Sequence, residues 1–269
     1  MTNLSDPVLA VAVRAARRAA SVIVDAARDL RRLPTFAKEH NDIVAAAQQD
    51  AQSAIVATIS AAFPEHAIQG EDAIDVKPPA AGCNFRWMID PLDGSSNFVH
   101  GYPYYAVSIA LANAGDLTHT AVLDPNRDEL FTAIHGKGAQ LNGAAIRVSA
   151  CMRLEDALIG TVFPTRRNSR MRAYTSVLTS LMTRCSIRRA GSCALDLAHL
   201  AAGHLDGFFV MTMRPRDIAA GALLVREAGG RVGDLSGGAE FLRTQEVVGA
   251  APGIFNPLRE AIVSARPIG

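Results

Sequence analysis

The stretch Asp90-Pro-Leu-Asp-Gly-Ser-Ser-Asn97 decides how this chain can be interpreted, because it combines carboxylates with a turn of small residues. The preceding segment, Phe85–Ile89, is apolar enough for a short buried strand, so Asp90 would stand at the carboxyl end of a strand. Asp93 follows after a turn that Pro91 would initiate, and this turn would aim both carboxylates at one point. Carboxylate oxygens are the ligands that hard cations such as Mg²⁺ prefer.

The next three residues, Gly94-Ser95-Ser96, form a turn with few side-chain atoms and open a predicted helix. Backbone N–H groups at a helix start, together with the positive end of the helix dipole, suit an anion. The sequence therefore predicts a cation site beside a phosphate site. Taken alone, the stretch could also be an acidic turn that serine caps.

Composition and charge limit the classes of protein that fit. The chain has 269 residues, of which 49% are hydrophobic, so it can bury a substantial core. A formal net charge of +1 gives no overall attraction for nucleic acid or an anionic membrane. The four cysteines lack a C-x-x-C spacing, which favours reduced thiols in a cytoplasmic protein. Arginines interrupt the apolar segment Val8–Val24, so we expect neither a signal peptide nor a membrane span.

The hydrophobic pattern predicts three successive kinds of structure. Two long helices, Val8–Leu30 and Asp42–Phe63, come first, and the basic run Arg28–Arg32 is a solvated helix end or, alternatively, a nucleic-acid contact. An antiparallel meander of three strands follows, over Tyr104–Leu111, Leu117–Leu123 and Glu129–Ile134. After about residue 150 strands and helices alternate: strand Ala157–Phe163, helix Arg172–Thr183, strand Ser186–Arg189, helix Cys193–Ala202, strand Gly207–Met213 and helix Ile218–Ala228.

This alternation is typical of a layered α/β architecture. We expect a single domain over residues 1–269, with subdomains of approximately 1–149 and 150–269 that face one cleft.

Two further acidic segments stand at predicted element boundaries, Gly70-Glu71-Asp72 and Arg216-Asp217-Ile-Ala-Ala-Gly221. Singly, Asp217 would be a helix N-cap and Glu71 a surface acid. Active sites are commonly built at such boundaries. Clustered carboxylates without a cation would raise one another's pKa, so a cluster of these acids implies a bound divalent metal.

Together these motifs resemble the inositol monophosphatase family, and within it a bacterial SuhB-like branch. The resemblance runs from about Val8 to past Gly249, and the segments that carry it are Gly70-Glu71, Trp87-Met-Ile-Asp-Pro-Leu-Asp-Gly-Ser-Ser-Asn-Phe98, Gly191-Ser-Cys-Ala-Leu-Asp-Leu-Ala198, Asp217-Ile-Ala-Ala-Gly221 and Glu227-Ala-Gly-Gly230. It implies an αβαβα sandwich of the inositol monophosphatase and fructose-1,6-bisphosphatase type. It also implies a homodimer that hydrolyses a small phosphate ester, similar to inositol monophosphate, with Mg²⁺ and a metal-activated water.

The resemblance also implies roles for residues of this chain. The ligands of two or three Mg²⁺ ions would be Glu71, Asp90, the Leu92 carbonyl, Asp93 and Asp217. The catalytic residues would be Glu71, Asp93 and Ser95, with the Ser95 hydroxyl orienting the attacking water. Gly94, Ser95 and Ser96 would hold the phosphate, and Gly191, Ser192 and Cys193 would lie beside the alcohol portion of the substrate.

Five positions depart from the family pattern and make this a divergent member. Ala45 and Gln48 replace a threonine and an aspartate, and Ser95 replaces the threonine that this aspartate normally contacts. We therefore expect a slower hydrolytic step, because general acid–base assistance is worth roughly 10²–10⁴-fold. Val210 replaces a glutamate that binds a ring hydroxyl, which argues against a preference for myo-inositol 1-phosphate. Arg216 replaces a tryptophan, and it would either bind a second anionic group of the substrate or be solvated.

Three functions stay open at this point. The first is a phosphatase for a small monoester. The second is a phosphatase for a nucleotide 3′-phosphate, a sugar bisphosphate or histidinol phosphate, with Arg216 contacting the second anionic group. The third is a weakly catalytic partner of the transcription antitermination machinery, which the Gln48 and Ser95 changes would permit. A scaffold has no physical reason to keep clustered like charges, so the carboxylates favour an enzyme.

Overall fold

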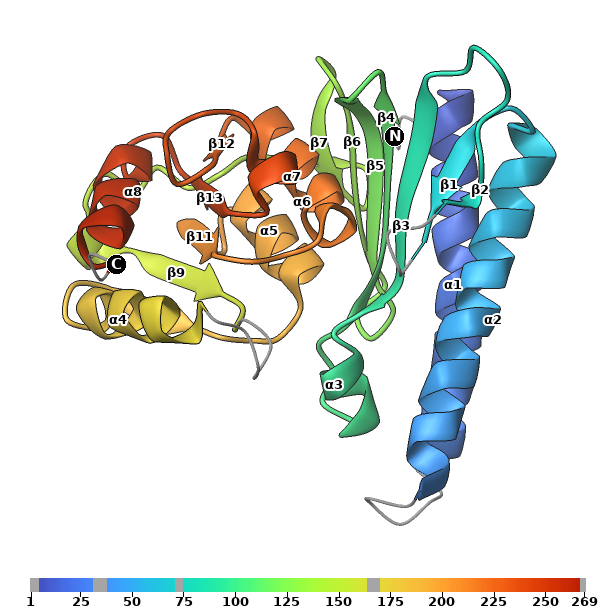
Figure 1. Ribbon diagram of the computed structural model, residues 1–269, viewed down its shortest axis with the longest axis horizontal. Coiled ribbons are helices and arrows are strands. Elements are labelled where there is room, and N and C mark those ends of the chain that lie inside the picture. The colour runs from blue at the N-terminus through green and yellow to red at the C-terminus, as the bar shows by residue number, and fades with distance from the viewer. Residues whose placement is uncertain (1–4, 31–37, 71–74, 164–169, 267–269) are drawn as a thin grey trace.

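The computed structural model describes residues 5–30, 38–70, 75–163 and 170–266, with only the backbone described for residues 38–41. Its elements stack in five layers: a helix pair, a sheet, a second helix pair, a second sheet and a third helix pair (Figure 1). The predicted αβαβα sandwich is confirmed.

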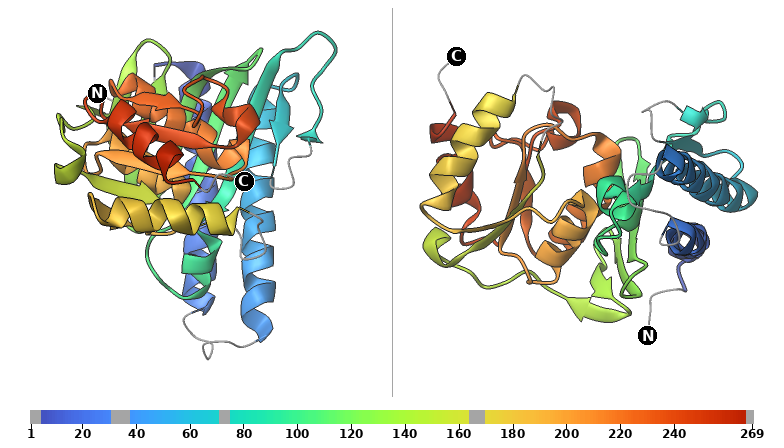
Figure 2. Two further views of the ribbon diagram at one scale, coloured as in Figure 1. Left: turned by 60° about the vertical axis from the view of Figure 1, so that its left-hand side comes forward. Right: turned by 90° about the horizontal axis from the view of Figure 1, so that it is seen from below.

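The first layer consists of two long helices, α1 (Pro7–Leu30) and α2 (Lys38–Ala62). They run side by side along one face of the larger sheet (Figure 2). Helix α1 has apolar residues at helical spacing, and it buries side chains such as Leu9 and Ile23 against the sheet, where they are at most 1% exposed. Both helices were predicted from this periodicity.

The larger sheet has the strand order β2-β1-β3-β4-β5-β6-β7-β8. From β3 to β8 each strand is antiparallel to the next, as the meander prediction requires, whereas β1 is parallel to β3. The bounds are β1 Ala67–Gln69, β2 Asp75–Lys77, β3 Phe85–Asp93, β4 Ala106–Asn113, β5 Asp116–Asp124, β6 Glu129–Ile134, β7 Gly138–Leu141 and β8 Ala144–Ile146. The short strands β1 and β2 were not predicted.

Strand β3 positions the acidic motif. Successive side chains of a strand point to opposite faces. Trp87 and Ile89 accordingly pack with the outer helices, and Met88 packs on the inner side. Asp90, two residues after Met88, therefore faces the middle of the molecule.

Asp93 would face the opposite way from Asp90 in a regular strand, because the two are an odd number of residues apart. The pairing shifts there instead: Asp90 opposes Ser108 and Asp93 opposes Ala106, so β3 carries one extra residue relative to β4. This irregularity, of the kind that a β-bulge produces, brings both carboxylates to the inner face. The predicted turn at Pro91 was wrong in form, since the strand continues to Asp93, but the carboxylates share one side as expected.

The second half of the chain supplies the other three layers. The smaller sheet has the order β10-β9-β11-β13-β12, in which β9 is parallel to β10 and β11, and β13 is antiparallel to β11 and β12. Its strands are β9 Leu158–Thr161, β10 Ser186–Arg188, β11 Gly207–Val210, β12 Arg231–Gly233 and β13 Val247–Ala250. The alternation to α6 was predicted, but β12, β13 and the last helix were not. The division into subdomains near residue 150 stays a prediction; the larger sheet ends at Ile146 and the smaller begins at Leu158.

Helices α5 (Cys193–Ala201) and α6 (Pro215–Glu227) form the middle layer, and α4 (Met171–Met182) and α8 (Phe255–Ser264) cover the far side of the smaller sheet (Figures 1 and 2). Short elements complete the structure: α3 (Ser95–Val99), a 3₁₀ turn at Leu154–Asp156 and α7 (Phe241–Thr244). The middle helices approach closely at Gly221, where a Cβ would lie only 2.3 Å from Cβ of Leu197. Glycine is therefore required at this crossing.

None of the helices in the described residues combines the length and the apolar character needed to cross a bilayer.

Candidate active site

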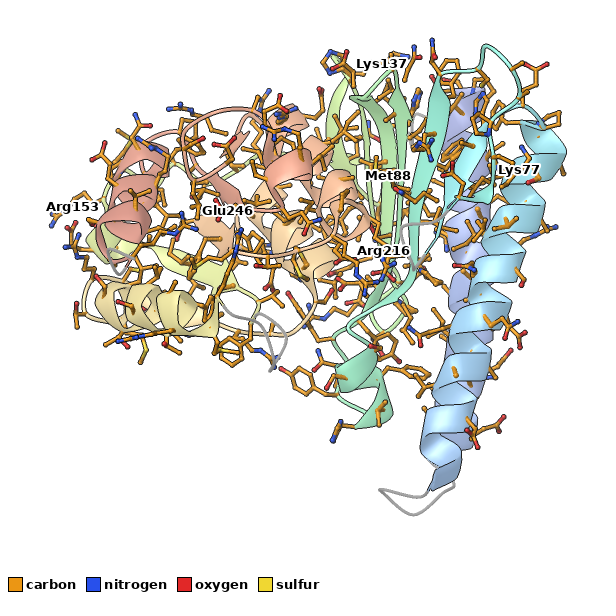
Figure 3. The ribbon with its side chains drawn as sticks, in the orientation of Figure 1. Lys77, Met88, Lys137, Arg153, Arg216 and Glu246 are labelled. Carbon is orange, nitrogen blue, oxygen red and sulfur yellow. The ribbon has the colours of Figure 1, made fainter. Side chains whose placement is uncertain are left out.

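Three buried carboxylates come together where β3 ends and α6 begins. Asp90, Asp93 and Asp217 are 6%, 7% and 8% exposed. Asp217 lies in the first turn of α6, which starts at Pro215, a residue whose fixed φ suits the first helical position. Figure 3 labels the neighbouring Arg216 at the junction of α6 and β3. The structure thus unites three of the four acids that the sequence singled out, and the fourth, Glu71, lies outside the described residues.

Asp93 is fixed by the start of helix α5. Its Oδ2 accepts a hydrogen bond from Ser192 Oγ at 2.6 Å and another from the Ala194 N–H at 2.7 Å. Ser192 is the N-cap of α5 and also accepts from the Leu195 N–H at 3.2 Å. The positive end of this helix therefore faces the carboxylate. Sequence reasoning missed Ala194, because a backbone donor leaves no signal in the side-chain pattern.

Burial and mutual repulsion raise the pKa of Asp90 and Asp93. The pKa of Asp90 is well above its ordinary value, chiefly through burial and then through the charges of Asp93 and Asp217. Burial raises the pKa of Asp93 to about 7, and Asp217 adds to the rise, while the hydrogen bonds from Ser192 and Ala194 oppose it. Arg216 lowers both values. Without a cation, Asp90 and Asp93 therefore keep their protons to higher pH than usual, and a cation would stabilise their charged forms.

Arg216 is part of this site. It is 8% exposed, its Nε lies 3.1 Å from Oδ1 of Asp217, and its Nη1 donates to the Gly70 carbonyl at 3.3 Å. The alternative that Arg216 is solvated is therefore wrong. Oδ2 of Asp217 accepts the Arg214 N–H at 3.2 Å, so both carboxylate oxygens are engaged. Asp217 helps to cap α6 from within its first turn, whereas the sequence suggested an N-cap.

The donor chemistry at the end of β3 fits a hard divalent cation. Among the described residues no hydrogen bond reaches Oδ2 of Asp90 or Oδ1 of Asp93, so each acid keeps an oxygen for a ligand. Asp217 differs, because a cation there would have to share its Oδ1 with Arg216 or displace the guanidinium. Within the same described segments, no three His, Cys, Asp or Glu side chains form a group already arranged for a metal ion. The complete ligand set stays a prediction.

The turn after Asp93 requires glycine. Gly94 has φ 92°, and a Cβ there would lie 2.9 Å from the Tyr104 carbonyl oxygen. Helix α3 begins at Ser95, which is half-buried, and Ser96 is exposed. The first N–H groups of a helix have no acceptor within it, so they are available to an anion.

Asn97 joins this turn to the Gly191 loop. Its Nδ2 donates to the Tyr104 carbonyl at 2.7 Å and to the Ala190 carbonyl at 2.9 Å. Gly191 has φ 101°, and a Cβ there would lie 2.9 Å from Asn97 Nδ2. Sequence reasoning quoted Asn97 within the motif but gave it no role. Its amide sets the distance between the two loops.

Other predicted residues lie deeper in the protein. Leu92 is 2% exposed, and Cys193 and Val210 are completely buried in the core between the sheets. Burial raises the pKa of the Cys193 thiol well above its ordinary value, and Asp93 is the largest of the charges that add to the rise. The Cys193 thiol is therefore not a reactive thiolate.

The fold and this site define the class of protein. The model of the inositol monophosphatase family matches residues 4–266. The chain belongs to the inositol monophosphatase family.

Its relatives include proteins named Nus factor SuhB. The one from Pseudomonas aeruginosa is 43% identical over 259 residues, which cover 95% of this chain and 96% of the relative, and the one from Escherichia coli K12 is 40% identical over 247 residues, covering 91% and 92%. Among solved structures, the extragenic suppressor protein suhB from Bartonella henselae matches with a TM-score of 0.86 at 36% identity, covering 96% of this chain and 100% of that one. Inositol monophosphatase from Anabaena matches with a TM-score of 0.86 at 31% identity, covering 99% of both chains.

Proposed function

We propose that this protein is a Mg²⁺-dependent phosphomonoesterase that hydrolyses a small phosphate ester. The observation that supports this most directly is the burial of Asp90, Asp93 and Asp217 in one place, next to the Gly94 turn. Burying like charges costs free energy unless an opposite charge compensates them. Two oxygens that no described residue engages, Oδ2 of Asp90 and Oδ1 of Asp93, give a metal ion its entry point.

Different residues would bind the metal ions and the phosphate. Asp90, Asp93 and Asp217, with Glu71 and the Leu92 carbonyl, would hold two or three Mg²⁺ ions. Mg²⁺ bound there would stabilise the charge on the phosphoryl oxygens and make water more acidic. The N–H groups of Gly94, Ser95 and Ser96 would bind the phosphate oxygens.

Water would be positioned by three side chains. The Ser95 hydroxyl would accept a hydrogen bond from the attacking water, and Glu71 and Asp93 would hold the proton that it gives up. Positioning and charge stabilisation account for most of phosphoryl-transfer catalysis, so no covalent enzyme intermediate is needed. Asp93 is suited to this role because the bonds from Ser192 and Ala194 fix its orientation.

The alcohol portion of the substrate would contact the segment Gly191, Ser192 and Cys193. Val210 is completely buried and apolar, so it offers no acceptor for a ring hydroxyl. We therefore propose an ester that is less hydroxylated than myo-inositol 1-phosphate. The Arg216 guanidinium would attract a second anionic group, which keeps nucleotide 3′-phosphates, sugar bisphosphates and histidinol phosphate as candidates.

The test is Mg²⁺-dependent release of phosphate from five esters: inositol 1-phosphate, glycerol 2-phosphate, fructose 1,6-bisphosphate, adenosine 3′,5′-bisphosphate and histidinol phosphate. Turnover should need Mg²⁺ and vanish in Asp90→Asn. The matched control is Asp50→Asn, which removes an exposed carboxylate on α2 and should leave turnover unchanged. No turnover on any ester by a protein that still binds Mg²⁺ would overturn the proposal.

A second candidate function comes from the relatives that are named Nus factors. We propose as the alternative that the chain is a weakly catalytic partner of the transcription antitermination machinery. Purification of tagged wild-type and Asp90→Asn proteins from cells separates the two functions. Equal recovery of transcription proteins by both, with no change in the cells' phenotype, would support this alternative over the enzyme.

We also propose a cytoplasmic homodimer, which is the expectation for this family. Light scattering measures the mass in solution directly. A monomer mass at micromolar concentration would contradict the dimer.

A further inference from the structure

The Asn97 side chain cross-links two segments that are far apart in the sequence. It reaches from helix α3 to the Gly191 loop (residues 189–192), where its Nδ2 donates to the Ala190 carbonyl at 2.9 Å across 93 residues of chain. The same nitrogen donates to the Tyr104 carbonyl at 2.7 Å. An amide nitrogen carries two hydrogens, so both donors of the side chain are used.

This cross-link fixes the position of the Gly191 loop in both directions. The hydrogen bond to Ala190 resists a movement of the loop away from α3. The opposite movement is blocked by contact, because a Cβ at Gly191 would lie 2.9 Å from Nδ2 of Asn97 and 3.1 Å from its Oδ1. The amide therefore packs directly on the Gly191 backbone.

Helix α3 is the fixed side of the cross-link. Phe98, the residue after Asn97, is 2% exposed and packs edge-on against Tyr105 with ring centroids 5.2 Å apart. The backbone carbonyl of Asn97 accepts the N–H groups of His100 at 3.1 Å and Tyr102 at 2.9 Å. Since the Asn97 backbone is held in this way, the position of its amide determines where the Gly191 loop lies.

The distance between α3 and the Gly191 loop bears directly on the proposed reaction. The phosphate would bind at the Gly94 turn, where α3 begins, and the alcohol portion would contact Gly191, Ser192 and Cys193. The gap between the turn and the loop is therefore the room that the alcohol has. A misplacement of about 1 Å at a reacting centre can cost on the order of 10²-fold in rate.

We propose that Asn97 is a positioning residue that determines which alcohol portion the site accepts. It acts through the Ala190 carbonyl and the Gly191 backbone rather than through the reacting atoms. This role presupposes the proposed phosphatase function and adds selectivity to it, because selectivity is a ratio of kcat/KM values for competing substrates.

The test compares kcat/KM for two esters with alcohols of different size, inositol 1-phosphate and glycerol 2-phosphate, on the full chain with Mg²⁺. Their ratio does not depend on the fraction of folded enzyme, and a charge near the phosphate affects both esters alike. Asn97→Asp keeps the shape of the side chain but turns an acceptor toward two carbonyl oxygens, so the gap should widen. The ratio of inositol 1-phosphate to glycerol 2-phosphate should rise about tenfold. Asn97→Ala, which removes the donors without repulsion, should raise it about threefold.

Two control variants separate positioning from a general loss of stability. Tyr104→Phe removes the hydrogen bond from the Tyr104 hydroxyl to Asp196 but keeps the carbonyl that accepts from Asn97, so the ratio should change less than about twofold. Asn256→Asp adds the same charge at an exposed position of α8 and should change neither kcat/KM value.

Three results would overturn the role of Asn97. The first is a ratio that is unchanged or lower in Asn97→Asp, and the second is an equal rise in Tyr104→Phe. The third is a wild-type protein that hydrolyses neither ester. Turnover of another of the five esters would in that case leave the phosphatase function standing, whereas no turnover on any ester would remove both.

Discussion

Nε of Arg216 lies 3.1 Å from Oδ1 of Asp217, with both side chains about nine-tenths buried. The pair places a fixed positive charge among three carboxylates, where it lowers the pKa of Asp90 and Asp93. Arg216 thus performs part of the charge compensation that a metal ion would otherwise provide. A metal ion bound at Asp217 would compete with Arg216 for the same carboxylate oxygen.

Replacing this arginine should have opposite effects on metal affinity and on stability. Arg216→Gln should bind Mg²⁺ about tenfold more tightly, because the competing charge is gone. Without metal the same variant should lose about 3–5 kcal/mol of stability, since buried carboxylates then lack their cation. Calorimetric Mg²⁺ titration and urea unfolding in EDTA measure the two effects. Arg153→Gln, at an exposed arginine far from the site in Figure 3, should show neither; weaker Mg²⁺ binding by Arg216→Gln would contradict the competition.

The metal-free protein should become less stable as pH rises through the neutral range. Asp93 has an ordinary pKa of 3.8 that the fold raises to about 7, so the folded state binds the proton more tightly than the unfolded chain. The free energy of unfolding therefore falls as pH rises from about 4 to about 7, and the loss reaches at most about 4 kcal/mol. Mg²⁺ should cancel it by compensating the carboxylate.

Urea midpoints between pH 5 and pH 8, with EDTA and with Mg²⁺, measure this dependence. Burial raises the pKa of Asp196 to about 8, so Asp196 also makes the protein less stable as pH rises. Burial lowers the pKa of His199 to about 4, so His199 has the opposite effect below about pH 6.5. Asp93→Asn removes the Asp93 contribution and also the part of the pKa rise of Asp90 and Asp196 that the charge of Asp93 causes. If wild type and Asp93→Asn give parallel curves in EDTA, Asp93 does not carry the effect.

Restoring the family's acid on α2 should accelerate hydrolysis. Gln48 is half-buried on α2, and α2 packs against α3, the helix that begins at Ser95. Gln48→Asp should raise kcat by roughly 10²-fold, the lower end of general acid–base assistance, because an anionic acceptor makes the Ser95 hydroxyl a better partner for water. The control is Gln49→Asp, which adds the same charge at an exposed neighbour. Equal kcat values for both variants and wild type would refute the expectation.

The Gly94 turn should not accept a side chain. Gly94→Ala should cost about 2–4 kcal/mol, from the positive φ and from the contact of its Cβ with the Tyr104 carbonyl. Gly136→Ala has a similar φ of 74° but open space around the added carbon, so it should cost only about 1 kcal/mol. Urea unfolding of both variants compares the two. Equal losses would mean that the Tyr104 contact relaxes freely.

The layered fold and the acidic residues of the site could be predicted from the sequence, whereas the hydrogen bonds and ion pairs that fix these acids could not. Asp90 and Asp217 could be found because they stand at the boundaries of strongly periodic elements, and α1 and α2 because their apolar residues recur at helical spacing. Strands β1 and β12 have only three residues each, which is too short for an alternation to be recognised.

The remaining differences depend on tertiary contacts. The local sequence around Pro91 is compatible both with a turn and with a strand that carries one extra residue. Only the pairing with β4 distinguishes the two structures. The burial of Arg216 could not be predicted either, because its acceptor on Gly70 is 146 residues away in the chain. Ser192 carries a typical N-cap signal, but its second bond, to Asp93, spans 99 residues.

The contact at Gly221 has a mechanical consequence. Because the Leu197 side chain of α5 packs directly on the backbone of Gly221 in α6, the two helices should move as one rigid body. Ser192 and Asp217, at the first turns of these two helices, then keep a constant separation, while Asp90 belongs to a different body, the larger sheet. A motion of the helix pair relative to β3 would therefore change the distance between Asp90 and Asp217, and the two hydrogen bonds from Ser192 and Ala194 to Asp93 are the contacts that resist it.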